Sequence, residues 1–319
     1  MADSKINANI PLNIDKVETY SIHKRKSLVN IDNFANPWEK GLSFSNFLDN
    51  LPSILAGNDL KNIIAAISKA AINKKKVCFA MGGHVIKVGL NPVLIDLMEK
   101  NIITMVSMNG AGIIHDLEIA LTGKTSEDVA ASLDQGQFGM AKETSELCNI
   151  AINNAKKESK GLGRAVGELI NTENLPFKKQ SLLAKGAKLN IPMTVHVAIG
   201  TDIIHMHPGF DAGACGQASH IDFKIFAANI AQLENGVFIN AGSAVILPEV
   251  FLKALTLVRN LKYSPKNFTS INLDFIRHYR PMTNVVNRPT QSGGKGYSLV
   301  GHHEILIPLI AAGVIEKIS

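Results

Sequence analysis

Short apolar runs that end in glycine alternate with helical patterns along most of this chain. Val77–Met81 is closed by Gly82-Gly83, and the apolar run 102–108 is closed by Asn109-Gly110. Runs of this length bounded by glycine are typical of buried parallel strands. Residues 92–100, between them, have helical spacing. Two such units in succession predict an α/β fold with a Rossmann-like, doubly wound, mostly parallel sheet.

The alternation continues to the C-terminus without a low-complexity linker or an internal repeat. We therefore expect an N-terminal leader and helical segment over residues 1–70, followed by one continuous domain over 71–319. The leader ends in apolar residues at helical spacing: Leu51, Ile54, Leu55, Leu60, Ile63, Ile64 and Ile67. Further helices are expected at 139–157, 161–169, 219–233, 247–258 and 304–314. Further strands are expected at 191–199, 237–241 and, as the last strand, 268–275.

Composition excludes some classes of protein. With 319 residues, 46% of them hydrophobic, the chain can bury a large core. The net charge is +6, but basic residues are scattered except for Lys74-Lys75-Lys76 directly before a strand. Aromatic residues make up only 6% of the chain, and no aromatic-interleaved basic stripe is present. We expect no nucleic-acid partner.

The sequence also lacks signals for membrane insertion or secretion. No apolar run has the length of a membrane-spanning helix, and the opening residues are polar and interrupted by Pro11. Cys78, Cys148 and Cys215 are odd in number and far apart, as in proteins of a reducing compartment. We expect a cytoplasmic protein without a membrane partner.

Polar and glycine residues follow four of the expected strands. Because carboxyl ends of parallel strands meet at one edge, these residues predict a rim large enough for a dinucleotide. Glycine at such turns is also often purely conformational, and the Gly-x-Gly-x-x-Gly fingerprint is absent. The four segments are Gly82-Gly83-His84, Asn109-Gly110-Ala111-Gly112, Gly200-Thr201-Asp202 and Asn240-Ala241-Gly242-Ser243.

Lys295 lies in a stretch rich in glycine and serine, Arg288-Pro289-Thr290-Gln291-Ser292-Gly293-Gly294-Lys295. A lysine that is desolvated or placed beside other cations can become a neutral nucleophile that forms an imine. An ordinary solvated loop lysine is the other interpretation.

Five motifs follow one another at residues 79–89, 109–117, 201–202, 288–295 and 302–309. In these motifs and in their order, the chain resembles the deoxyhypusine synthase family from about residue 70 onward. The resemblance implies a Rossmann-like, NAD-dependent homotetramer. It further implies oxidation of spermidine, an aminobutyl group held as an imine on a loop lysine, and its delivery to a lysine of a translation factor or, in a related enzyme, to putrescine.

The resemblance also implies roles for individual residues. Lys295 matches the lysine that forms the imine. Gly242, Gln291 and Arg288 fall at substrate-binding positions. The cofactor positions are Gly82, Gly83, His84, Asn109, Gly110, Ala111, Asp116, Asp202, His302 and His303.

Departures from the family pattern argue against spermidine as the substrate. Ile114-His115 stands where the family has a pair of glutamates, His207 where it has an aspartate, and Gln291 where it has a glutamate. The position of a family histidine that contacts the substrate falls near Leu247. Burying an ammonium group without a carboxylate costs several kcal/mol. We expect an amine or amino-acid-like substrate instead. Three arginines precede Lys295: Arg277, Arg280 and Arg288. They suit binding of an anionic or zwitterionic substrate. They suit equally well binding of the cofactor's pyrophosphate or salt bridges between subunits.

Seven of the ten histidines lie in or beside the motif segments. They suit acid/base chemistry, metal binding, or polar contacts near a cofactor. In an extended segment, His205 and His207 would lie on one side, with His115 or Asp202 as a third metal ligand. We predict His115 and His207 as proton-transfer residues and assign no metal ligand.

Together these features predict an NAD-dependent transferase that works through an imine on Lys295, on a substrate other than spermidine. One alternative is a homospermidine synthase-like aminobutyl transferase with its acids supplied by Glu304 or Asp274. Two others are a metal-dependent hydrolase built on the histidines and a non-catalytic NAD-binding protein.

Overall fold

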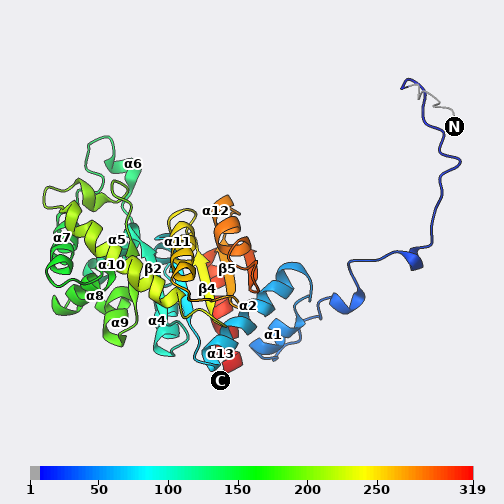
Figure 1. Cartoon of the computed structure of the whole chain (residues 1–319), viewed down its shortest axis with the longest axis horizontal. Helices are drawn as coiled ribbons and strands as arrows, with labels where there is room; N and C mark the ends of the chain where they lie inside the picture. The colour runs from blue at the N-terminus through cyan, green and yellow to red at the C-terminus, as the bar shows by residue number, and fades with distance from the viewer. Residues whose placement is uncertain (1–7, 319) are drawn as a thin grey trace.

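A six-stranded, all-parallel sheet with helices on both faces forms the centre of the protein in a computed structural model, which describes residues 8–318 (Figure 1). The order is β3-β2-β1-β4-β5-β6. This confirms the predicted α/β, Rossmann-like, doubly wound fold. The strands are β1 Val77–Met81, β2 Met105–Asn109, β3 Met193–His196, β4 Val237–Ala241, β5 Thr269–Asp274 and β6 Lys295–Val300.

The order of the strands reverses between β1 and β4. The chain runs outward from β1 through β2 to β3, then crosses back to β4 and runs outward through β5 to β6. All carboxyl ends meet along one edge of the sheet, here called the carboxyl edge, and all amino ends along the opposite amino edge. In sheets of this class, ligands bind outside the carboxyl edge beside such a reversal.

Helices of different lengths connect the strands and cover the sheet. The longer ones are α2 Leu55–Ile72, α4 Asn91–Glu99, α5 Gly110–Thr122, α7 Lys142–Lys157, α8 Leu162–Thr172, α9 Leu182–Leu189, α10 Ala212–Ile230, α11 Ile246–Asn260 and α13 His303–Ile318. The shorter α-helices are α1 Phe44–Asn50, α3 His84–Lys87, α6 Val129–Ser132 and α12 Tyr279–Pro281. Short turns of other helix types are η1 Ile22–Lys24, η2 Ile31–Asn33, η3 Lys178–Gln180, η4 Ile203–Met206 and η5 Met282–Asn287.

Alternating side chains of the strands build a core on each face of the sheet. On one face, Phe79 and Ile239 belong to the large core that includes residues of α2 and α13. On the other, Phe238 stacks on Phe251 of α11 with ring centroids 3.8 Å apart. Both faces are therefore apolar, as in sheets covered on both sides.

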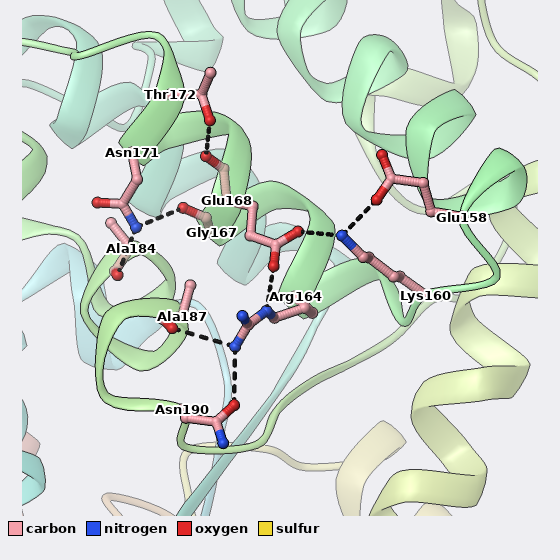
Figure 2. Close-up of polar contacts among 10 residues, drawn as sticks. All are labelled: Glu158, Lys160, Arg164, Gly167, Glu168, Asn171, Thr172, Ala184, Ala187 and Asn190. Atoms are coloured by element: carbon pink, nitrogen blue, oxygen red, sulfur yellow. Dashed lines mark hydrogen bonds and ion pairs between the residues drawn. The ribbon is translucent and has the colours of Figure 1, made fainter.

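Helices α5 to α9, inserted between β2 and β3, form a separate group at one end of the sheet (Figure 1, green). Polar contacts join α8 to the end of α9 (Figure 2). Arg164 donates to the carbonyl oxygen of Ala187 and to Asn190 Oδ1, both at 3.2 Å, and to Glu168 Oε1 at 2.5 Å. Asn171 donates to the carbonyl oxygen of Ala184 at 2.9 Å. These bonds fix the group that carries α5.

The structure corrects the prediction that residues 268–275 form the last strand. Lys295, predicted at the end of a glycine-rich loop, instead begins a sixth strand, residues 295–300, at the edge of the sheet. A Cβ atom at Gly294 would lie 2.5 Å from the carbonyl oxygen of Phe268, and one at Gly296 would lie 2.2 Å from that of Val286. The glycines therefore permit close backbone packing, and their small size concealed the strand pattern.

Several predicted element boundaries also shift. Leu51 and Ile54 precede α2, and Leu55 is 80% exposed instead of facing the core. The predicted strands 102–108 and 191–199 are shorter as β2 and β3. The predicted helix 219–233 begins earlier, because Asp211 accepts from the N–H of Ala214 and caps α10.

The described part of the leader runs away from the body of the protein (Figure 1, blue). Its large apolar side chains are between 52% and 87% exposed: Ile10, Leu12, Ile14, Val17, Tyr20, Ile22, Leu28, Val29, Ile31, Phe34 and Trp38. The first seven residues of the predicted leader lie outside the described residues. The domain division at residue 70 stays a prediction, and α2, before that boundary, packs against α13 and the sheet. No helix within residues 8–318 is long and apolar enough to span a membrane.

His196, at the end of β3, should make stability depend on pH. Burial lowers the pKa of His196 to about 3, against about 6.5 in an unfolded chain. The unfolded chain therefore binds more protons between these values, and stability falls as the pH drops through that range. Between pH 7 and pH 5 we expect His196 to account for a loss of about 2 kcal/mol.

Urea unfolding of the wild type and His196→Leu at the two pH values tests this expectation. The variant should lose less stability on acidification, and His220→Gln, at an exposed histidine, should behave as the wild type. An equal acid-dependent loss in His196→Leu and the wild type would contradict the assignment.

Candidate functional site

The ends of β1 and β4 approach each other closely at the carboxyl edge. The N–H of Gly82 donates to the carbonyl oxygen of Ala241 at 3.0 Å. A Cβ atom at Gly82 would lie 2.4 Å from the carbonyl oxygen of Gly242. Gly242 has φ of +66°, and a Cβ atom there would lie 2.7 Å from Cε1 of His303. Only glycine therefore fits these two positions, which border the reversal of strand order.

His303 places an unpartnered nitrogen beside these glycines. Its side chain is buried, and Nε2 donates to the carbonyl oxygen of Leu273 at 3.1 Å. The neutral ring therefore leaves Nδ1 as an acceptor, and Nδ1 has no hydrogen-bond partner. His84 lies edge-on to His303, with ring centroids 5.9 Å apart. His302, by contrast, is exposed and lies 3.7 Å from Glu304.

Asp202 lies at the beginning of α5, where β2 ends. A Cβ atom at Gly110 would lie 1.9 Å from Asp202 Oδ2, so the carboxylate occupies the space that glycine leaves. Asp202 Oδ2 and the neighbouring Asn109 Oδ1 are both buried without a hydrogen-bond partner. Burial raises the pKa of Asp202 to about 6, opposed by a hydrogen bond with Thr201. These atoms are acceptors available for a ligand.

The two histidines after Asp202 face different partners. His205 Nδ1 accepts from the N–H groups of Gly200 and Asp202, at 3.0 and 3.2 Å. His207 Nε2 donates to the carbonyl oxygen of Gly139 at 2.9 Å and lines another pocket, beside α7. The expected extended segment is wrong, because residues 203–206 form the helical turn η4. Within residues 8–318, no group of three or more His, Cys, Asp or Glu side chains is arranged to hold a metal ion.

His115 belongs to a chain of hydrogen bonds. Its Nδ1 lies 2.7 Å from Thr125 Oγ1, and the Thr125 hydroxyl donates to Glu118 Oε2 at 2.6 Å. Since the Thr125 proton is given to Glu118, the Thr125 oxygen must accept from Nδ1–H of His115. The free acceptor is therefore Nε2, which lies close to Gly83. Burial, then the charge of Lys87, lowers the pKa of His115 to about 4.

A cavity of about 220 Å³ joins His115 to Asp202. Ala111, at the first turn of α5, lines it and also packs near Gly83. The structure thus gathers ten of the predicted site residues along the carboxyl edge. They are Gly82, Gly83, His84, Gly242 and His303 at β1 and β4, and Asn109, Gly110, Ala111, His115 and Asp202 around α5.

Asp116, predicted at a cofactor position, holds other elements of the fold together. Its buried carboxylate accepts from Asn91 at 3.0 Å, from Ser181 at 2.5 Å, and from the N–H groups of Leu182 and Leu183 at 2.8 and 3.0 Å. Burial raises the pKa of Asp116, opposed by these bonds. Four donors fill the acceptor positions of a carboxylate, so Asp116 caps α9 and offers no free position to a ligand.

Lys295 lies at the amino edge, as the first residue of β6. It is exposed and lines a pocket of about 330 Å³ with residues of α2 and of the turns before β4 and β5. Gln291 is exposed, and Arg288 donates to Asn284 Oδ1 at 3.0 Å. The predicted proton-transfer residues and the predicted nucleophile therefore lie in separate pockets, with His115 in one, His207 in a second and Lys295 in a third.

Lys87, Glu118 and Thr125 were not predicted from the sequence. The spacing of His115 and Glu118, three residues apart on α5, could have indicated that they share a helix face. Thr125 comes from the loop after α5 and Lys87 from α3, and nothing in the sequence links these segments.

No protein-family model and no curated protein matches this chain. Among solved structures, a protein assigned as a deoxyhypusine synthase from Entamoeba histolytica has a TM-score of 0.51 and 12% identity, covering 88% of this chain and 96% of that one. A conserved protein assigned as LOR/SDH from Methanococcus maripaludis S2 has a TM-score of 0.50 and 15% identity, covering 87% and 71%.

AgrE, solved with ornithine and NAD+, has a TM-score of 0.50 and 11% identity, covering 82% of this chain and 34% of AgrE. This chain thus spans about a third of the length of AgrE. At these identities the likenesses show a deoxyhypusine synthase-like fold and leave the family open.

Replacing Asp116 should destabilise the fold. Asp116→Ala leaves four buried donors without an acceptor, and we expect a loss of about 3 kcal/mol or more in the free energy of unfolding, measured in urea. Asp96→Ala, at a half-buried aspartate of α4 that forms only a surface ion pair with Lys100, should change it by less than about 0.5 kcal/mol. Full stability of Asp116→Ala together with lost NAD binding would instead support the cofactor role that the family resemblance implies.

Proposed function

We propose that this protein is an NAD-dependent enzyme that binds the dinucleotide along the carboxyl edge, across the reversal between β1 and β4. The observation that carries the proposal is a set of three buried atoms without hydrogen-bond partners: Asp202 Oδ2, Asn109 Oδ1 and His303 Nδ1. Nε2 of His205 lies 3.9 Å from Asp202 Oδ2, beyond hydrogen-bond distance. A buried polar atom without a partner costs about 1–3 kcal/mol. A ligand rich in donors would remove this cost.

The chemistry of these residues fits NAD. The ribose hydroxyls and the carboxamide of NAD are donors, and an acidic side chain near the strand ends is a common partner of the ribose. In our proposal Asp202 and Asn109 hold a ribose, and the backbone at Gly82-Gly83 admits the close approach of the pyrophosphate. Bound NAD supplies an acceptor for hydride from a carbon beside nitrogen or oxygen.

His115 is our candidate for the residue that takes up a proton during the reaction. Nε2 carries the free lone pair, Nδ1–H is held by Thr125, and the ring lines the cavity beside Asp202. We propose an amine or amino-acid-like substrate. The structural likeness to AgrE, which was solved with ornithine and NAD+, supports this class of substrate.

Transfer through an imine on Lys295 requires this lysine to reach the substrate. Lys295 is the first of the six residues of β6, so the length of the strand separates it from the carboxyl edge. At about 3.3 Å per residue, this separation is roughly 16 Å. Lys295 of the same chain does not reach a substrate bound there. In our proposal, an imine therefore requires Lys295 of a second copy in the homotetramer expected from the family resemblance.

Isothermal titration with NAD tests the proposed cofactor site. Asp202→Ala should weaken NAD binding by about tenfold or more, because hydrogen bonds to a charged group contribute about 1.5–3 kcal/mol. Asp134→Ala, at an exposed aspartate in a loop, is the matched control and should bind as the wild type. Lys295→Ala should bind NAD within about threefold of the wild type.

Two results would overturn the proposal. One is the absence of NAD binding by the wild type at millimolar NAD. The other is loss of binding in Lys295→Ala with full binding in Asp202→Ala, which would place the dinucleotide at the amino edge.

A further inference from the structure

The cavity beside α5 carries charges of both signs. The apolar residues of its lining are Ala111, Ile114, Val129, Phe138 and Ile203. Its charged side chains come from separate elements: Lys87 from α3, Glu118 from α5, Glu127 from the following loop, and Asp202 from the turn after β3. At about 220 Å³ it is smaller than pockets for drug-sized ligands, which hold about 300–1,000 Å³, and so suits a small metabolite.

Lys87 is the cation of this cavity, and its exposed side chain has no partner within the part of the protein that the structure describes. Among residues 8–318, Lys87 Nζ makes no hydrogen bond or ion pair. The carboxylates differ in their availability. Glu118 accepts from Thr125 and Thr144, and Glu127 Oε2 accepts from the N–H of Gly139 at 2.8 Å. Asp202 keeps one buried oxygen without a hydrogen-bond partner, 3.9 Å from Nε2 of His205.

The hydrogen-bond chain fixes which atom of His115 meets a ligand. Glu118 accepts from Thr125 and Thr125 accepts from Nδ1–H, so Nε2 is an acceptor in the neutral ring. The low pKa of His115 keeps the ring neutral at pH 7. Glu118 and Thr125 therefore act as positioning residues: they set the tautomer of His115 without contacting the ligand.

We infer that this cavity binds an α-amino acid whose carboxylate pairs with Lys87 and whose amino group donates to His115 Nε2. The inference rests on the proposed function and names its substrate class. A simple amine would leave Lys87 without a partner. A 2-hydroxy acid would bring no positive charge into a cavity whose lining includes three acidic side chains. A zwitterion satisfies both signs of charge at once.

Binding experiments without NAD test the inference separately from the cofactor site. Thermal shift with the twenty standard L-amino acids and L-ornithine should identify at least one that stabilises the protein. Its affinity, measured by calorimetry, should exceed that of the corresponding amine and 2-hydroxy acid by about tenfold or more. If no amino acid stabilises the protein, or if the amine binds equally well, the inference is wrong.

Lys87→Met should weaken binding of that amino acid by about tenfold or more, while Lys124→Met, an exposed lysine that does not line the cavity, should leave it unchanged. NAD binding should persist in Lys87→Met. NAD binding without amino-acid binding would overturn this inference alone, whereas amino-acid binding without NAD binding would overturn only the cofactor proposal.

The positioning role of Thr125 has a spectroscopic signature. Nitrogen-15 chemical shifts of labelled histidine should show His115 as the Nδ1–H tautomer in the wild type. Thr125→Val should give a mixture of tautomers and weaker amino-acid binding, and Thr125→Ser should restore both. An unchanged tautomer in a folded Thr125→Val variant would refute the role.

Discussion

The carboxylate of Asp202, buried against the first glycine of α5, is the interaction on which the carboxyl edge depends. No residue larger than glycine fits at position 110, because the carboxylate occupies the space of its Cβ atom. Burial opposes the charge of Asp202, yet one oxygen remains without a hydrogen-bond partner. This oxygen lies beside the reversal of strand order, where ligands bind in sheets of this class. A bound ligand that donates a hydrogen bond to it would explain why the protein leaves it without a donor.

The packing of Asp202 against Gly110 also explains how the proposed cofactor site can lie beside the proposed proton-transfer residue, His115. Asp202 and His115 line the same cavity. Asp202, from the turn after β3, packs against Gly110 at the beginning of α5, and His115 lies on α5 more than a turn further along. The same helix therefore connects the proposed cofactor site with the proposed amino-acid site. Lys87 completes the cavity from α3, directly after the glycines that bring β1 and β4 together.

Sequence patterns predicted the central sheet well. β1 is a continuous apolar run closed by glycine, and β4 is apolar except for Asn240 and lies between two glycines. They missed β6, whose glycines permit close backbone contacts but carry no apolar signal. Most of the residues at the carboxyl edge were predictable, since parallel strands bring their carboxyl ends together. Asp116 was misleading because its four partners come from α4 and the start of α9. The position of Lys295 at the amino edge could not be predicted without knowing that it begins a strand. The hydrogen bond between His115 and Thr125 is a tertiary contact without a sequence signal.

Hydrogen exchange measured with and without saturating NAD tests the central claim most directly, because it reports where along the chain the dinucleotide binds. The account predicts slower exchange in peptides that cover residues 82–84, 109–113, 200–203 and 240–243, at the carboxyl edge. Peptides that cover residues 290–296 should exchange at the same rate with and without NAD. Slower exchange confined to residues 290–296 and 62–69, at the amino edge, would contradict it.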